Sequence, residues 1–419
     1  MAVDVMIIRL LLVIAILLAP FSTLHAAEGV SIGCILPLSG KFASYGNKAL
    51  QGIELAMERY NSKGLSKKSP VKLLIKDSEG LTEVAERAVN ELEREGVNVI
   101  IGPILGSTAD SAARRAQHLG IPIITMTQKE GITDIGDWVF RNCITNAAQV
   151  KGLVRHAVNG GIKKVAVLYP DNAYGRELST VFDVEMAKMG GEVVAAKSYR
   201  DGQTDFGPEI KAMVGPDFLK KIKAYTEGRE KRFKEAERSG IDKDQKNDLI
   251  KPRPGFDAIF IADYSERVGL IVPQLAFFDV TGIKLLGISG WNSPNLLKLA
   301  GRYLDNAMFV DGFFSGSQRP DVKEFVELYL KTFGEEPTIL EAQAFDTAGM
   351  VLSVAAGGIR SRDGIRNGIL KVREYPGICG NITFTGRDAE RGVYLLTVRN
   401  ERIEEVREEE DSQMNKLRP

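Results

Sequence analysis

Apolar residues along the chain alternate between the spacing of buried strands and that of helices. Residues 30–36 form an apolar strand-like run, and Leu50, Ile53, Met57 and Tyr60 then recur at helical spacing. The same alternation of strand spacing and helical spacing continues over the next hundred residues. The strands expected here are 30–36, 71–75, 97–101 and 121–125, with helices at 50–60, 85–92 and 108–118 between them. This succession predicts an α/β fold with a doubly wound parallel sheet.

A second series of the same kind follows. It comprises helix 147–158, strand 165–169, helix 176–189, strands 193–199 and 258–262, helix 265–278 and strand 283–288. A chain of 419 residues is also too long for one core of ordinary size. The sequence therefore predicts two lobes, each with its own doubly wound sheet.

The amino terminus has the pattern of a secretory signal peptide. Arg9 precedes the wholly apolar stretch 10–19, and the small residues Ala26 and Ala27 follow it. A membrane span needs about 20 apolar residues, so an uncleaved anchor is the less favoured alternative. We expect residues 1–26 to be removed, with cleavage near Ala26 or Ala27 and a periplasmic mature protein.

Composition narrows the possible functions. Lys and Arg total 55, as do Asp and Glu, so no net positive charge favours nucleic acid. After residue 26 the histidines are His118 and His156, which lie far from each other and from any cysteine in sequence. The sequence also lacks Gly-x-Ser-x-Gly and His-Glu-x-x-His motifs. We therefore expect no enzyme activity, no catalytic residue, no metal and no cofactor.

Candidate binding residues follow the predicted strands, because ligands of open parallel sheets bind at the carboxyl ends of the strands. After the third strand, Gly106, Ser107 and Thr108 open a helix, where hydroxyls and backbone N–H groups attract a carboxylate. Ser107 or Thr108 as a simple N-cap is the alternative, and it is compatible with binding. The loop 37–46 lacks phosphate-loop spacing, which disfavours nucleotides.

Several stretches resemble one family. They are KKVAVLYPDNAYGREL at 163–178, Thr204-Asp205-Phe206, and GNITFTG at 380–386. Together they resemble the type I periplasmic binding proteins, in particular the leucine/isoleucine/valine-binding branch of ABC importers. The resemblance implies two lobes joined by three hinge crossings, near residues 141–146, 311–316 and 375–382. Lobe 1 would comprise 27–143 and 316–378, and lobe 2 would comprise 144–315 and 379–419.

The resemblance also implies a function and a site. The expected function is capture of an amino acid or related metabolite between the lobes, with the membrane permease of an ABC importer as partner. The expected ligand-binding residues are Tyr45, Gly106, Ser107, Thr108, Thr127, Lys129, Tyr174, Asp263 and Tyr264. The family's ammonium-binding acid is replaced by Ser289-Gly290-Trp291, so Asp263 is the alternative partner for a ligand ammonium. Lys129, where the family has threonine, would pair with a second ligand acid.

Two features leave alternatives open. Residues 213–255 form a charged insertion, which is either a solvated helical excursion or a docking surface. The chain is also similar to the carboxyl domain of penicillin-binding-protein activators, so a regulator that binds a peptidoglycan synthase is the alternative function. The resemblance puts Cys143 and Cys379 at the first and third crossings, where they are either a disulfide or two separate buried thiols.

Overall fold

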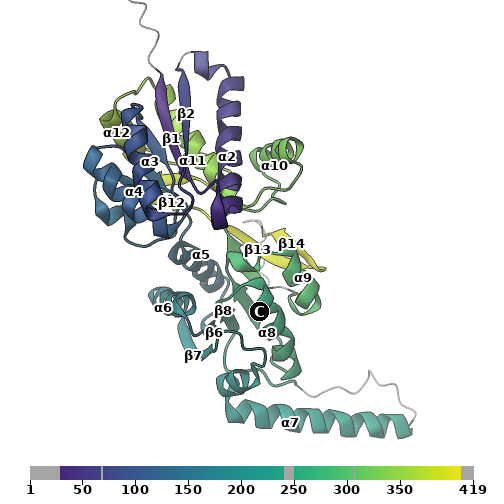
Figure 1. The fold of residues 1–419 in the computed structure, drawn as a ribbon. Coiled ribbons are helices and arrows are strands. Elements are labelled where there is room, and N and C mark those ends of the chain that lie inside the picture. The colour runs from purple at the N-terminus through teal and green to yellow at the C-terminus, as the bar shows by residue number, and fades with distance from the viewer. Residues whose placement is uncertain (1–28, 68, 240–249, 306, 407–419) are drawn as a thin grey trace, which may run out of the picture.

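The computed structural model describes residues 29–67, 69–239, 250–305 and 307–406. These residues form two lobes, each built on its own central sheet (Figure 1). The predicted signal peptide, residues 1–26, lies outside the described residues. The α/β class and the parallel-sheet lobes predicted from the sequence are confirmed.

The first lobe contains a five-stranded parallel sheet with the order β2-β1-β3-β4-β5. Its strands are β1 (Val30–Leu36), β2 (Val71–Asp77), β3 (Val99–Ile101), β4 (Ile123–Thr125) and β5 (Val139–Arg141). Helices α2 (Ala43–Ser62), α3 (Thr82–Arg94) and α4 (Gly106–Leu119) connect them. Later in the chain, α10 (Pro320–Phe333), α11 (Ile339–Ala356) and α12 (Arg362–Leu370) return to this lobe (Figure 1).

The second lobe contains a seven-stranded sheet with the order β14-β13-β10-β9-β8-β6-β7. Its parallel part comprises β6 (Lys164–Pro170), β7 (Glu192–Tyr199), β8 (Ala258–Ile261), β9 (Lys284–Gly287) and β10 (Met308–Asp311). Around it lie α5 (Asn146–Asn159), α6 (Ala173–Lys188), α8 (Ser265–Phe277) and α9 (Pro294–Ala300). The antiparallel strands β13 (Tyr394–Arg399) and β14 (Arg402–Glu405), of which β14 forms the sheet edge, were not predicted from the sequence.

A hairpin near the carboxyl terminus moves one expected lobe boundary. Its strands, β11 (Ile382–Phe384) and β12 (Ala389–Arg391), pair with each other. Asp388 between them accepts hydrogen bonds from Thr133 and Arg141 of the first lobe, at 2.9 and 2.6 Å. The hairpin therefore lies with lobe 1, and the third crossing falls between β12 and β13 rather than within 375–382.

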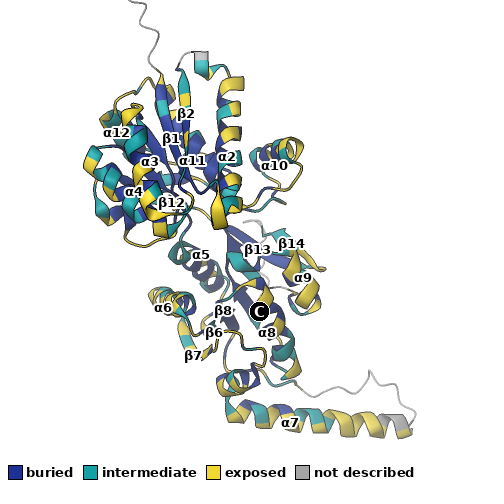
Figure 2. Ribbon diagram, viewed as in Figure 1, coloured by how far each residue is buried: buried dark blue, intermediate teal, exposed yellow. Residues whose placement is uncertain are grey.

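The charged insertion is largely one helix, α7 (Gly207–Ser239), which projects from the second lobe (Figure 1). Gly215, with φ of 77°, and Pro216 interrupt it near its start. Phe218 and Ile222 pack into the lobe, whereas the helix beyond them is mostly exposed (Figure 2). Residues 213–239 of the insertion are part of this helix, as a helical excursion requires, whereas residues 250–255 are not helical. Its use as a docking surface stays a prediction.

Helix α11 is the core helix of the first lobe. By length and mean hydropathy its 18 residues could cross a membrane, but 67 % of them are buried in the protein. The buried side chains pack along α2, so they belong to a protein core.

All three cysteines are buried and free. The disulfide considered for Cys143 and Cys379 is therefore absent, and the alternative of two separate buried thiols is correct. The Cys143 thiol lies 3.5 Å from the Ile144 carbonyl, and the Cys379 N–H donates to Asp346. Each cysteine is thus held in its own local surroundings.

Candidate functional site

The amino terminus of α4 offers backbone donors in the first lobe. Leu105 is its N-cap residue and supplies no side-chain cap. The N-cap role considered for Ser107 or Thr108 is therefore wrong, since both residues lie inside the first turn. Within the described chain, the N–H groups of Gly106 and Ser107 donate to no other residue. Such a helix end favours an anion, and Ser107 adds an exposed hydroxyl.

Thr108, in contrast, faces the interior of the lobe. Its side chain is fully buried, and its hydroxyl donates to the Leu105 carbonyl at 3.2 Å. This hydrogen bond holds the loop before α4 in place. Thr108 therefore shapes the helix terminus and does not present its hydroxyl to a ligand.

Thr127 and Lys129 lie next to this helix terminus. A Cβ built on Gly106 would be 3.5 Å from the Thr127 hydroxyl and 3.6 Å from the Lys129 Cβ. The Lys129 ammonium binds Asp110 at 2.9 Å, and hydrogen bonds from Arg114 and Lys129 hold the pKa of Asp110 below its usual value. Thr127 and Lys129 therefore lie within van der Waals reach of the start of α4.

Two tyrosines form an aromatic pair in the second lobe. Tyr174, in the first turn of α6, stacks on Tyr264, the N-cap residue of α8, with ring centroids 5.1 Å apart and planes 12° from parallel. Tyr264 is 53 % exposed and Tyr45 of the first lobe is 52 % exposed. Burial raises the pKa of Tyr174, so its hydroxyl stays protonated. Exposed aromatic faces of this kind suit the apolar part of a ligand.

Asp263 supplies a carboxylate beside that pair. It accepts hydrogen bonds from the Tyr199 hydroxyl at 2.5 Å and from the Tyr264 N–H at 2.7 Å. Burial, together with the bond to Asp263, raises the pKa of Tyr199. Tyr199 was not predicted from the sequence, although it ends β7 and so meets the same strand-end rule that selected the other residues.

The residues described above form two sets: Gly106, Ser107, Thr127 and Lys129 in the first lobe, and Tyr174, Tyr199, Asp263 and Tyr264 in the second. Both sets lie beside the first crossing between the lobes. On one side, Arg141 donates to the Lys129 carbonyl at 2.9 Å. On the other side, Asn146 donates to Glu177, three residues after Tyr174, at 3.3 Å. Among the described residues, no hydrogen bond, ion pair or ring contact joins the two sets. The structure thus has two half-sites flanking a hinge, and they are not in contact.

The half-sites differ in charge. The first-lobe half-site offers the positive end of a helix, beside which the Lys129 ammonium is paired with Asp110, and the second-lobe half-site contributes the Asp263 carboxylate. No group of three or more His, Cys, Asp or Glu side chains able to hold a metal occurs in the part of the chain that the structure describes. The arrangement matches a small molecule with a negative group at one end and a positive or hydrogen-bonding group at the other.

Comparison with known proteins identifies related sequences and folds. Leu/Ile/Val-binding protein homolog 3 of Brucella melitensis is 29 % identical over 184 residues, which are 43 % of this chain and 50 % of that protein. The chain thus spans about half the length of the curated relatives it matches.

Two solved structures share the fold. The branched-chain amino acid transporter substrate binding protein LivJ of Streptococcus pneumoniae, solved with isoleucine, has a TM-score of 0.61 at 23 % identity, covering 90 % of this chain and 99 % of that one. An ABC transporter solute binding protein of Rhodopseudomonas palustris, solved with 3,4-dihydroxybenzoic acid, has a TM-score of 0.60 at 23 % identity, covering 88 % and 93 %. The model of the family described as periplasmic binding protein matches residues 29–402, and the chain therefore belongs to that family.

Proposed function

We propose that this protein is the exported solute-binding component of an ABC importer, and that it captures an amino acid or a related metabolite between its lobes. The opposite charges of the two half-sites carry the proposal. A ligand carboxylate would bind the N–H groups of Gly106 and Ser107, and a ligand ammonium would bind Asp263. Tyr174 and Tyr264 would cover the apolar side chain.

The ligands of the two similar structures support this class. Isoleucine and 3,4-dihydroxybenzoic acid differ in shape, but both carry a carboxylate. Only the amino acid carries an ammonium group. Because Asp263 places a negative charge in the second-lobe half-site, an amino acid is favoured over an acid without an ammonium group.

The proposal extends to location and partner. A solute-binding protein of this family works outside the inner membrane and delivers its ligand to a membrane permease. The apolar stretch at residues 10–19 supports export of this chain. We expect binding without turnover, because the site contributes hydrogen bonds and charges but no nucleophile paired with a base.

Calorimetric titration of the mature protein tests this function. The panel contains the common amino acids and, for comparison, 4-hydroxybenzoate and 3,4-dihydroxybenzoate. We expect one amino acid or a small group of them to bind with one site per chain, and the Tyr174→Ala variant to bind more weakly. If the aromatic acids bind and no amino acid does, the amino-acid assignment is wrong.

The alternative of a regulator of peptidoglycan synthesis predicts a different result. Such a protein would bind a peptidoglycan synthase, and no member of the panel would bind it. None of the relatives and structures described above is a regulator of that kind. Binding of an amino acid with loss of affinity on Tyr174→Ala would exclude the regulator as the main function.

A further inference from the structure

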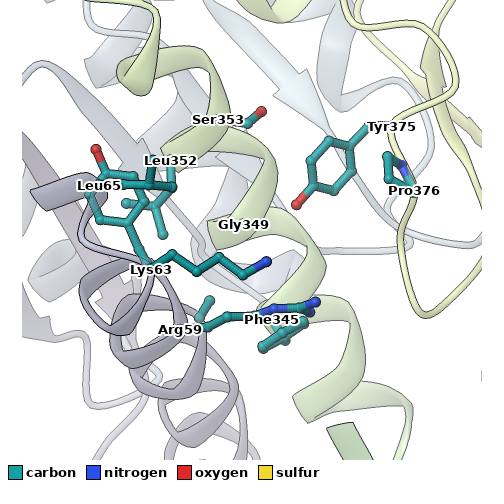
Figure 3. A pocket seen from close by; sticks show the side chains of 11 residues that line it. Arg59, Lys63, Leu65, Phe345, Gly349, Leu352, Ser353, Tyr375 and Pro376 are labelled. Atoms are coloured by element: carbon teal, nitrogen blue, oxygen red, sulfur yellow. The ribbon is translucent and has the colours of Figure 1, made fainter. Parts of the chain in front are cut away.

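A separate cavity lies in the first lobe between α2 and α11. Its volume is about 260 Å³. The lining residues are Ala56, Arg59, Tyr60, Lys63, Leu65, Phe345, Gly349, Leu352, Ser353, Tyr375 and Pro376 (Figure 3). No residue of the two half-sites is among them, so this cavity is distinct from the proposed interlobe site.

The inner wall of the cavity is apolar. Phe345 and Leu352, from α11, are 6 % and 2 % exposed, and Tyr60 of α2 is 5 % exposed. A Cβ at Gly349 would lie 2.6 Å from the Tyr375 hydroxyl oxygen, so the absence of a side chain there lets this hydroxyl pack against α11. Gly349 therefore allows Tyr375 to form part of the cavity wall.

Two cations lie at the cavity on the α2 side. Arg59 and Lys63 are four residues apart, so they lie on the same face at the end of the helix. The Arg59 guanidinium lies 5.7 Å from the Phe345 ring centroid and 3.6 Å from the exposed carboxylate of Glu324. Lys63 forms no ion pair with a described residue. The local charge is therefore positive.

Tyr375 adds an unused hydrogen-bonding group. Its side chain is half-buried, and its hydroxyl, directed toward α11 at Gly349, has no hydrogen-bond partner among the residues that the structure describes (Figure 3). Burial raises the pKa of Tyr375 to about 12, so the hydroxyl is a donor at neutral pH. The hydroxyl is not fully buried, so it is accessible to hydrogen-bond a molecule in the cavity.

We propose that this cavity is a second ligand site, which binds a small carboxylate that carries an aryl or branched apolar group. An apolar cavity of about 150 Å³ accommodates benzene, so the volume here has room for a ring and a short side chain. The apolar group would lie against Phe345 and Leu352. The carboxylate would bind Arg59 or Lys63 and accept a hydrogen bond from Tyr375.

The cavity also adjoins Asp346, whose carboxylate pairs with Arg391 just before the third crossing. Phe345 precedes Asp346, which holds the N–H groups of Ile378 and Cys379 at 2.8 and 2.9 Å. Tyr375 belongs to the strand segment just before that contact. A molecule in the cavity would thus touch both chain segments that Asp346 joins.

Phenylacetate, titrated into the mature isotope-labelled protein, is the probe that tests the site. The backbone amide signals of Gly349, Ser353 and Tyr375 should shift with phenylacetate. The uncharged phenylacetamide should bind at least about tenfold more weakly, since it has lost the charge-assisted hydrogen bond. Arg59→Gln and Lys63→Gln should together weaken phenylacetate at least about tenfold.

Control variants distinguish binding in this cavity from binding elsewhere on the protein. Lys323→Gln removes an exposed lysine of α10 outside the cavity and should leave the affinity unchanged. Tyr174→Ala, in the second lobe, should leave the three amide shifts unchanged. The proposal is wrong if the three signals do not move at about 10 mM phenylacetate. It is also wrong if phenylacetamide binds equally well or if Lys323→Gln weakens binding as much as the cavity variants.

Discussion

The Asp346 carboxylate lies 2.6 Å from the Arg391 guanidinium, and each side chain is only 2 % exposed. Asp346 belongs to α11 of the first lobe, whereas Arg391 ends β12 immediately before the chain crosses to the second lobe. Asn142, at the first crossing, donates to Thr347 of the same helix at 3.0 Å. Helix α11 therefore fastens two of the three crossings by buried polar contacts.

The first prediction concerns this buried pair. Asp346→Ala leaves the Arg391 guanidinium buried without a counter-charge, and it should lower the free energy of unfolding by about 3–5 kcal/mol. Glu327→Ala, which removes an exposed acid of α10, should change it by less than about 0.5 kcal/mol. Urea unfolding of both variants provides the measurement. Equal stability of the two variants would show that the pair does not hold the hinge.

The second prediction concerns Asp311, at the end of β10 where the chain leaves the second lobe. Burial raises its pKa to about 7, although Asn292 and the Gly312 N–H donate to it. Between the unfolded pKa, near 4, and the folded value, the folded protein binds more protons than the unfolded chain. This residue therefore makes stability fall as the pH rises from about 4 to about 7.

Asp311→Asn keeps the size of the side chain and removes the titration. The stability of the variant relative to the natural protein should increase as the pH rises through this window and then level off above it. Urea unfolding at several pH values measures the difference in the free energy of unfolding between the two proteins. The other titrating groups contribute equally to both proteins, so their contributions cancel in this difference. A difference that does not change with pH would contradict the raised pKa of Asp311.

The third prediction concerns the charge of Asp263. Asp263→Asn preserves an acceptor for Tyr199 or Tyr264 but removes the negative charge. It should weaken a bound amino acid by at least about tenfold, because a charge-assisted hydrogen bond contributes about 1.5–3 kcal/mol. The matching 2-oxo acid, which lacks the ammonium, should lose little affinity. Asp183→Ala, an exposed acid on α6, is the control and should bind as the natural protein does.

The fourth prediction concerns the cysteines. Burial raises the pKa of Cys143 to about 11 and the pKa of Cys34 and Cys379 as well, so few reactive thiolates form at neutral pH. The folded protein should react slowly with a chromogenic thiol reagent. Denatured without reduction, the natural protein should give three thiols. A count of one would mean that two cysteines are joined after all.

The sequence predicts a strand or helix well where the apolar residues have a regular spacing and strands alternate with helices along the chain. Strand β1 was predicted at the residues where it occurs, because the run Val30–Leu36 is mostly apolar and mostly buried. Strands β13 and β14 were not predicted, since a short antiparallel hairpin at a sheet edge has no helix beside it to mark its ends. The hairpin before them was assigned to the other lobe, because its contacts through Asp388 depend on tertiary structure.

The same distinction applies to the site. Loops at strand ends placed Gly106, Lys129 and Tyr174 beside the hinge, because parallel strands direct all their carboxyl ends to one edge. The sequence did not show that Thr108 is buried or that Tyr199 binds Asp263, since both depend on the direction of a side chain. Nor did the spacing of Asp346 and Arg391 indicate their pairing across 45 positions.

The central claim is that a small ligand binds between the lobes and joins two half-sites that do not touch in this structure. X-ray scattering of the mature protein, with and without a saturating amino acid identified by calorimetry, tests it most directly. Contacts with Ser107 on one side and Tyr174 on the other require the lobes to approach, so the radius of gyration should decrease on binding. The Tyr174→Ala variant, measured at the same ligand concentration, should show a smaller decrease. A radius that stays unchanged at proven saturation would contradict the claim.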